Sequence, residues 1–142
     1  MLIPTLNEEA TIGRVIYEIP VRVLSDEGYD TVIYVVDPNS EDTTQQKALE
    51  KDAVVLPFKQ PAKGSAMQFA FASVRADYFI MVDGDDTYPP ERITDFVRLL
   101  GTYGVVLGSR IKGRIKEGAM TRTNVFGRRR LPPWLGCSLK KI

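Results

Sequence analysis

The chain has no histidine and a single cysteine among its 142 residues. The absence of imidazole excludes histidine general-base catalysis and histidine-ligated zinc, so acid–base chemistry would fall to carboxylates or to the substrate itself. Cys137 has no second thiol for an internal disulfide, and we expect a reducing, cytoplasmic setting. No apolar run reaches the roughly 20 residues of a membrane-spanning helix, and no signal-peptide pattern opens the chain.

The net charge of +1 conceals a strong asymmetry along the chain. Residues 1–109 carry nine Lys and Arg against seventeen Asp and Glu, whereas residues 110–142 carry ten Lys and Arg against Glu117 alone. A basic segment of this kind is typical of contact with phosphates, nucleic acid or an anionic membrane surface, and the alternative is a solvated, partly disordered end. We expect one domain over residues 1–127 and an irregular basic tail over residues 128–142.

Apolar, β-branched runs alternate with segments of helical periodicity. The expected strands are residues 2–4, 31–36, 53–58, 78–82 and 105–107. The expected helices are residues 8–19, a short helix that is capped by Ser40 or Asp42 and ends at residue 51, residues 64–74 and residues 89–100. This alternation predicts an α/β fold, with a Rossmann-like, mostly parallel sheet flanked by helices.

An acidic cluster directly follows the apolar run at residues 78–82. Asp83, Asp85 and Asp86 surround Gly84, which we expect to turn the backbone tightly so that Asp83 and Asp85 address one point. Mg²⁺ and Mn²⁺ prefer oxygen ligands and take one or two carboxylates, with water and phosphates completing the shell. The alternative is a polar turn after a strand. Asp86 is expected to point outward, because three adjacent acids rarely all bind one ion.

Polar residues follow each of four expected strands, at residues 5–8, 37–40, 83–86 and 108–110. Ligands of open parallel sheets bind at the carboxyl ends of the strands, so one sheet edge would carry all the candidate chemistry.

Ordered motifs along the chain resemble the family 2 glycosyltransferases of GT-A fold, the group that contains dolichol-phosphate mannose and glucose synthases. The motifs are Ile-Pro-Thr-Leu-Asn-Glu-Glu at residues 3–9, Val-Val-Asp-Pro-Asn-Ser-Glu-Asp-Thr at 35–43, Lys-Gly-Ser-Ala at 63–66, Val-Asp-Gly-Asp at 82–85, Tyr-Pro-Pro-Glu at 88–91 and Gly-Ser-Arg at 108–110. Residues 113–120, with Asn124 and Gly127, resemble the polyprenyl-phosphate branch. Each motif alone is weak, but together and in order they indicate the family.

The resemblance implies a role for each matching residue. The residues implied to bind the nucleotide are Pro4, Thr5, Glu8, Asp37, Lys63 and Asp83. Asp83 and Asp85 are implied to bind the cation, Mg²⁺ or Mn²⁺, and Asp85 and Arg110 to take part in catalysis. The residues implied to bind the acceptor phosphate are Arg114, Arg122 and Arg128. Three of these assignments have plain structural alternatives: a turn or helix-cap aspartate at Asp37, a solvated lysine at Lys63 and a surface ion pair at Arg110.

The implied activity is metal-dependent transfer of a sugar from a UDP-glucose or GDP-mannose type donor to a polyprenyl or dolichyl phosphate. An acceptor phosphate is already anionic near neutral pH and needs no strong protein base. Past Asn124 the chain departs from the family pattern, so we expect a C-terminally truncated member with an incomplete acceptor side. The alternative is therefore a truncated module that binds nucleotide sugar without turnover.

Two further readings are weaker. A nucleotidyltransferase usually has a Gly-rich basic loop after its first strand, which residues 5–9 do not form. A nucleic-acid binder is not favoured, because the basic tail lacks interleaved aromatics apart from Phe126 and Trp134. The expected partners are the nucleotide-sugar donor and the polyprenyl phosphate. We also expect peripheral contact with an anionic membrane at its cytoplasmic face. The exposed edge of the sheet favours homo-oligomerisation.

Overall fold

The structure of the protein is a computed structural model that describes residues 1–59 and 63–108. The chain divides into two units, Met1–Val106 and Leu107–Ile142, and nearly all of the described residues lie in the first. The expected domain boundary at residue 127 lies outside the described residues. The same holds for four predicted site residues, Arg110, Arg114, Arg122 and Arg128.

Three parallel strands form the sheet: β1 (Leu2–Pro4), β2 (Tyr34–Asp37) and β3 (Val54–Pro57), in the order β1-β2-β3. Ile3 is in register with Val35, and Val35 with Val55. On the other side of β1, an isolated parallel bridge joins Leu2 to Met81. The spatial order β3-β2-β1-Met81 is that of one half of a doubly wound sheet, as the alternating sequence pattern predicts.

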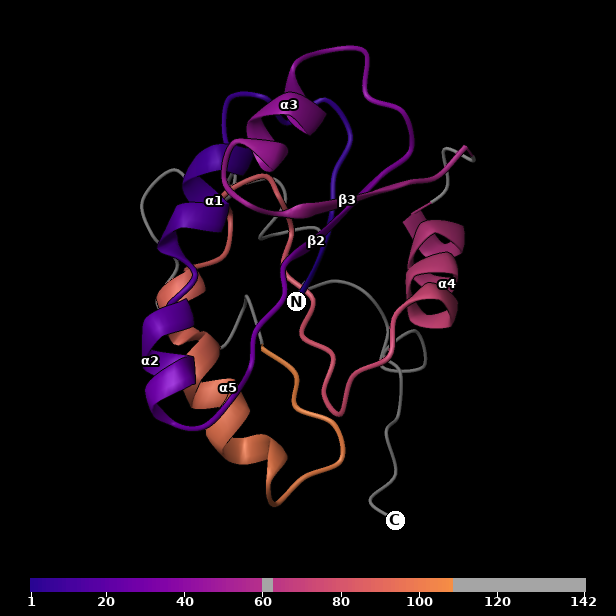
Figure 1. The fold of residues 1–142 in the computed structure, drawn as a ribbon. Coiled ribbons are helices and arrows are strands. Elements are labelled where there is room, and N and C mark those ends of the chain that lie inside the picture. Colours follow the sequence, from indigo (N-terminus) through magenta and orange to yellow (C-terminus); the bar gives the residue numbers. More distant parts are fainter. Residues whose placement is uncertain (60–62, 109–142) are drawn as a thin grey trace, which may run out of the picture. The chain divides into compact units, whose positions relative to one another are not determined.

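Five α-helices and one 3₁₀ turn are found in the described residues. They are α1 (Ile12–Glu18), α2 (Val21–Asp26), α3 (Thr44–Leu49), α4 (Lys63–Ser73), η1 (Pro90–Arg92) and α5 (Ile93–Leu100). Figure 1 shows α1, α2 and α5 on one side of the sheet and α4 on the other.

Each face of the sheet has its own apolar core. Ile3 and Val35 point toward α1 and α5, where they join Ile12, Ile93 and the other members of the larger cluster. Their neighbours point the opposite way, and Leu2 and Val36 pack with Ala66, Met67 and Ala70 of α4. This alternation is the period-2 side-chain pattern of a strand, and full burial of one Val, Leu or Ile side chain contributes about 1.5 to 3 kcal/mol.

Several expected elements differ from the structure. The helix expected from residue 8 begins only at Ile12, because residues 8–11 form a turn in which the Thr11 and Ile12 amides donate to the Glu8 carbonyl. The strand expected at residues 78–82 is reduced to the bridge at Met81. The strand expected at residues 105–107 is absent, and Val105 and Leu107 are each 72% exposed, without a neighbouring strand to cover them.

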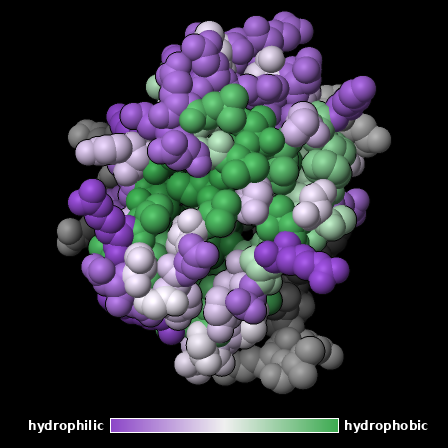
Figure 2. All heavy atoms as spheres, in the orientation of Figure 1, coloured by the Kyte–Doolittle hydropathy of each residue, from purple (hydrophilic) through white to green (hydrophobic). Residues whose placement is uncertain are grey.

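Helix α4 packs on the sheet through small and flexible side chains. Ala66, Met67 and Ala70 are buried, as is Val74 just after the helix, whereas Phe71 is 49% exposed. Phe71 instead meets Phe79 edge to face at the rim, with 5.1 Å between ring centroids. Exposed apolar surface also lies over β3, the edge strand, where Figure 2 shows hydrophobic side chains across the middle of the viewed face and Val54 is 43% exposed.

Candidate nucleotide and metal site

A cleft of about 200 Å³ opens where β1 ends and the acidic turn of residues 83–86 begins. Polar residues of the motifs at residues 3–9 and 82–85 line it together with an apolar wall, formed by Leu6, Val36, Pro38 and Ala66. The full lining is Pro4, Thr5, Leu6, Glu8, Val36, Pro38, Ala66, Asp83, Gly84 and Asp85. The fold therefore brings together five predicted site residues. The apolar wall was not predicted, although Leu6 and Pro38 lie within the motifs at residues 3–9 and 35–43.

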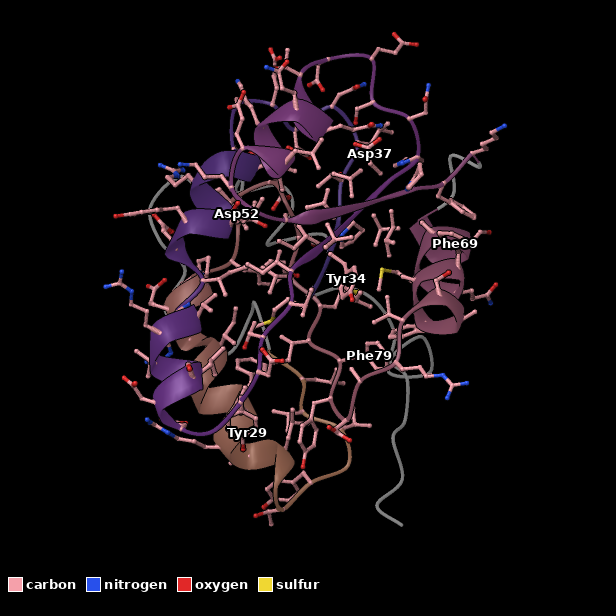
Figure 3. The ribbon with its side chains drawn as sticks, viewed as in Figure 1. Tyr29, Tyr34, Asp37, Asp52, Phe69 and Phe79 are labelled. Atoms are coloured by element: carbon pink, nitrogen blue, oxygen red, sulfur yellow. The ribbon has the colours of Figure 1, made fainter. Side chains whose placement is uncertain are left out.

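Asp37 ends β2 and is fully buried, behind the cleft and not in its lining. Figure 3 shows it at the carboxyl end of β2, beside the segment that leads to α3. Its Oδ1 accepts from the Ser40 amide at 2.6 Å and Gln45 Nε2 at 3.0 Å, and its Oδ2 accepts from the hydroxyls of Ser40 at 2.7 Å and Thr5 at 3.3 Å. The carboxylate thereby fixes Thr5 at the cleft. Contact between Asp37 and a nucleotide stays a prediction. Such contact requires that one of the present donors, such as Ser40, releases its hydrogen bond to the carboxylate.

The loop after β1 (residues 5–11) and the loop after β2 (residues 38–43) are tied together by reciprocal hydrogen bonds. The Asn7 amide donates to Ser40 Oγ at 2.9 Å, and the Glu41 amide donates back to Asn7 Oδ1 at 3.0 Å. The Asn7 side chain thus serves the contact between the loops and not the start of α1, whose N-cap is Thr11. Asn7 and Asn39 both have positive φ, of 55° and 76°, which asparagine tolerates better than most residues.

Two acids extend this tie on the solvent side. Glu9 Oε2 accepts from the Thr43 hydroxyl at 2.7 Å and the Thr43 amide at 3.2 Å, and these hydrogen bonds hold the pKa of Glu9 below its ordinary value. Burial would raise the pKa of Asp42, but hydrogen bonds from the Thr44 hydroxyl and amide and from the Glu9 amide outweigh it and lower that pKa. Both acids therefore stay ionised to lower pH than free side chains do, and each accepts a hydrogen bond that joins the two loops.

The acidic turn separates its three carboxylates. Asp85 Oδ1 caps the turn by accepting from the Thr87 amide at 3.0 Å and the Thr87 hydroxyl at 2.6 Å, whereas Oδ2 accepts no hydrogen bond from the described residues. Asp86 has a positive φ of 57° and pairs with Arg14 of α1, so it turns away from the cleft as predicted. Asp83 and Asp85 remain in the lining.

Gly84 has a different role from the expected one. Its φ is not in the left-handed region, so the turn does not need glycine for backbone freedom. Instead, a β-carbon at this position would lie 2.7 Å from Thr5 Cγ2. Glycine is required because the acidic turn packs directly on the end of β1.

The donor set suits a hard divalent cation. Among residues 1–59 and 63–108, no group of three or more Asp, Glu, Cys or His side chains is arranged to hold a metal ion. A cation that binds with a nucleotide needs only one or two carboxylates, and the cleft lining contains two, Asp83 and Asp85. Their role as metal ligands stays a prediction. Lys63 begins α4, and the position of its side chain lies outside the described part of the chain.

The chain matches Glycosyl transferase family 2 over residues 1–138. It belongs to that family. The match includes the motifs at residues 3–9 and 82–85, and both contribute to the lining of the cleft. The GT-A fold expected from these motifs is confirmed, because a crystal structure of glucosyl-3-phosphoglycerate synthase from Mycobacterium tuberculosis with Mn²⁺ and UDP-glucose is 32% identical, with a TM-score of 0.60, over 71% of this chain.

Curated relatives of this chain include sugar-transfer enzymes of archaea. The low-salt glycan biosynthesis hexosyltransferase Agl6 of Haloferax volcanii is 34% identical over 84% of this chain. The dolichol-phosphate mannosyltransferase of Pyrococcus furiosus is 29% identical over 80% of it. The chain spans 29% of the first protein, 33% of the second and 38% of the mycobacterial synthase. Among the described residues, no helix has both the length and the apolar character needed to span a membrane.

Proposed function

We propose that this chain binds a nucleotide sugar with a divalent cation and belongs to a hexosyltransferase that delivers the sugar to a polyprenyl or dolichyl phosphate. The observation that carries the proposal is the cleft shared by Thr5, Glu8, Asp83 and Asp85 in a family 2 chain. The Mn²⁺ and UDP-glucose in the mycobacterial structure support the proposed metal and donor class. The dolichol phosphate in the name of the archaeal mannosyltransferase supports the proposed acceptor class.

Asp83 and Asp85 would hold Mg²⁺ or Mn²⁺ in this site. A bound divalent cation supplies positive charge that stabilises the nucleoside diphosphate as it departs from the sugar. Thr5 and Glu8 also line the cleft, and their hydroxyl and carboxylate oxygens suit the hydroxyls and amides of a nucleoside. Pro4 contributes only main chain and ring to the lining, while Lys63 and Asp37 remain proposed nucleotide contacts.

On the acceptor side, Arg110 is proposed to bind the diphosphate and Arg114, Arg122 and Arg128 to bind the lipid phosphate. Arginine is suited to this task because its planar guanidinium donates two parallel hydrogen bonds to phosphate oxygens. An acceptor phosphate oxygen would attack the anomeric carbon without a protein base, which fits a chain without histidine.

Peripheral contact with an anionic membrane at the cytoplasmic face is part of the same proposal. The ten basic residues among residues 110–142 support it, and such contact weakens as salt screens the charges. Co-sedimentation with vesicles of phosphatidylcholine and phosphatidylserine at low and high salt tests it. Sedimentation that resists high salt contradicts a purely electrostatic contact. Self-association at the exposed β3 edge is proposed as well, and its test is the mass in solution.

A transfer assay tests the proposed activity. The purified chain is incubated with Mn²⁺, labelled UDP-glucose or GDP-mannose, and a polyprenyl phosphate, and the label in the lipid extract is measured. Label in the lipid fraction that is lost on addition of EDTA supports transfer. Donor binding without any labelled lipid supports the second candidate, a nucleotide-sugar-binding module without turnover, which the departure from the family pattern past Asn124 favours.

A further inference from the structure

Thr11 connects the first loop to the acidic turn. It is half-buried just before α1, and its hydroxyl oxygen lies 2.7 Å from the Gly84 carbonyl oxygen, 73 residues away. The same oxygen lies 3.2 Å from Glu8 Oε2 and 3.3 Å from the Glu8 carbonyl. A hydroxyl has one proton to donate, and the shortest of the three contacts, to Gly84, is the hydrogen bond that it makes best.

The turn can be held at this point only through its backbone, because Gly84 has no side chain. Its carbonyl stands between Asp83 and Asp85, the two carboxylates of the cleft, and the next residue but one, Asp86, pairs with Arg14 on the first turn of α1. Residues at the start of α1 therefore contact the turn at two points, Gly84 and Asp86. Of these two, only Gly84, the partner of Thr11, directly adjoins both Asp83 and Asp85 in sequence.

We infer that Thr11 is a positioning residue that sets the direction of Asp83 and Asp85 toward a divalent cation. The inference rests on the proposed function, since it concerns how that same site is built. Partners that orient metal ligands commonly change metal affinity by about 10- to 100-fold when they are lost. The Thr11→Val variant, which keeps the shape and removes the hydroxyl, should weaken Mn²⁺ binding by about 10-fold.

The chain offers a matched control in Thr94. At the start of α5, the Thr94 hydroxyl donates to the carbonyl of Glu91, three residues earlier, at 3.4 Å. The Thr11 hydroxyl lies in the same way 3.3 Å from the carbonyl of Glu8, also three residues earlier. Only Thr11 reaches Gly84. Thr94→Val therefore removes the local helix-start contact alone, and Thr11→Ser restores the hydroxyl at the site.

The experiment measures Mn²⁺ affinity by electron paramagnetic resonance of the free ion, at saturating UDP or GDP, with thermal unfolding as the check on folding. Weaker Mn²⁺ binding in Thr11→Val and Thr11→Ala, recovery in Thr11→Ser and no change in Thr94→Val support the inference. Wild-type affinity in a folded Thr11→Val or Thr11→Ala, or an equal loss in Thr94→Val, overturns it. If the wild-type chain itself shows no metal-dependent nucleotide binding, the proposed function fails first and this inference fails with it.

Discussion

Gly84 and Thr5 are in such close contact that a β-carbon on residue 84 would lie 2.7 Å from the Cγ2 atom of Thr5. The other near atoms, Ile12 Cδ1 and Ile3 Cγ2, would be 3.6 Å away, at ordinary van der Waals distance. The two halves of the cleft, the end of β1 and the acidic turn, thus meet through one methyl group.

Replacing Gly84 with alanine should destabilise the fold by about 1 to 3 kcal/mol, the usual cost of overpacking a filled site. Urea unfolding measures the change. The Thr5→Ser replacement removes the obstructing methyl and keeps the hydroxyl that donates to Asp37, so the double variant should lose less stability than the two single variants added together. Additive losses would contradict a direct clash.

Gly13 is the control for this prediction. A β-carbon at that position in α1 would meet nothing within 4 Å. Gly13→Ala should therefore leave the fold unchanged or more stable by up to about 1 kcal/mol, because alanine has the better helix propensity.

Asp37 should be needed for folding before it is needed for binding. Asp37→Ala leaves donors from Thr5, Ser40 and Gln45 without their acceptor in a buried place, at a cost of about 2 to 4 kcal/mol in urea unfolding. Asp37→Asn keeps one acceptor oxygen for the Ser40 amide and should lose less. If Asp37→Asn folds with wild-type stability yet loses nucleotide affinity in calorimetry, the residue contacts the ligand directly.

Glu9 should make stability depend on acidity. Its pKa is lowered on folding from an ordinary value of 4.5, chiefly by the Thr43 hydroxyl, so its contribution is complete above pH 4.5 and is lost as the pH falls through the lower, folded pKa. The stability advantage of the wild type over Glu9→Gln should hold from neutral pH to about 4.5 and then shrink. Thr43→Val removes the main cause and should flatten this dependence; an unchanged slope would show that the hydroxyl is not responsible.

The sheet and its covering helices were predictable from the sequence because each carries a local pattern. The β-branched run at Tyr34–Asp37 and the spacing of Ile12, Val15 and Ile16 are signals of this kind. Helix α2, only six residues long, gave too few turns for a periodic pattern and was missed. The apolar triplet at residues 105–107 read as a strand, but no neighbouring strand pairs with it among the described residues.

The acidic turn could be located from the sequence, whereas the contacts that shape the site could not. The ties from Asn7 to Ser40 and from Thr11 to Gly84 join residues 33 and 73 positions apart, and nothing local in the sequence marks them. The sequence indicated that Gly84 matters, but the predicted reason, a tight turn of the backbone, was wrong. Its packing against Thr5 is a contact between distant residues that no local sequence pattern marks. The partners of Asp37 are mixed: Ser40 and Gln45 follow it by three and eight residues, whereas Thr5 is 32 residues away and is brought to it by the fold.

Calorimetric titration with UDP-glucose and GDP-mannose, with and without Mn²⁺, tests the metal-dependent nucleotide-sugar site most directly. It is applied to the wild type, to Asp85→Asn and to Asp86→Asn, whose side chain pairs with Arg14 outside the cleft lining. We predict that one donor binds the wild type and Asp86→Asn in a Mn²⁺-dependent manner and that Asp85→Asn loses this dependence. Equal, Mn²⁺-dependent affinity in Asp85→Asn, or no binding of either donor to the folded wild type, would contradict the site.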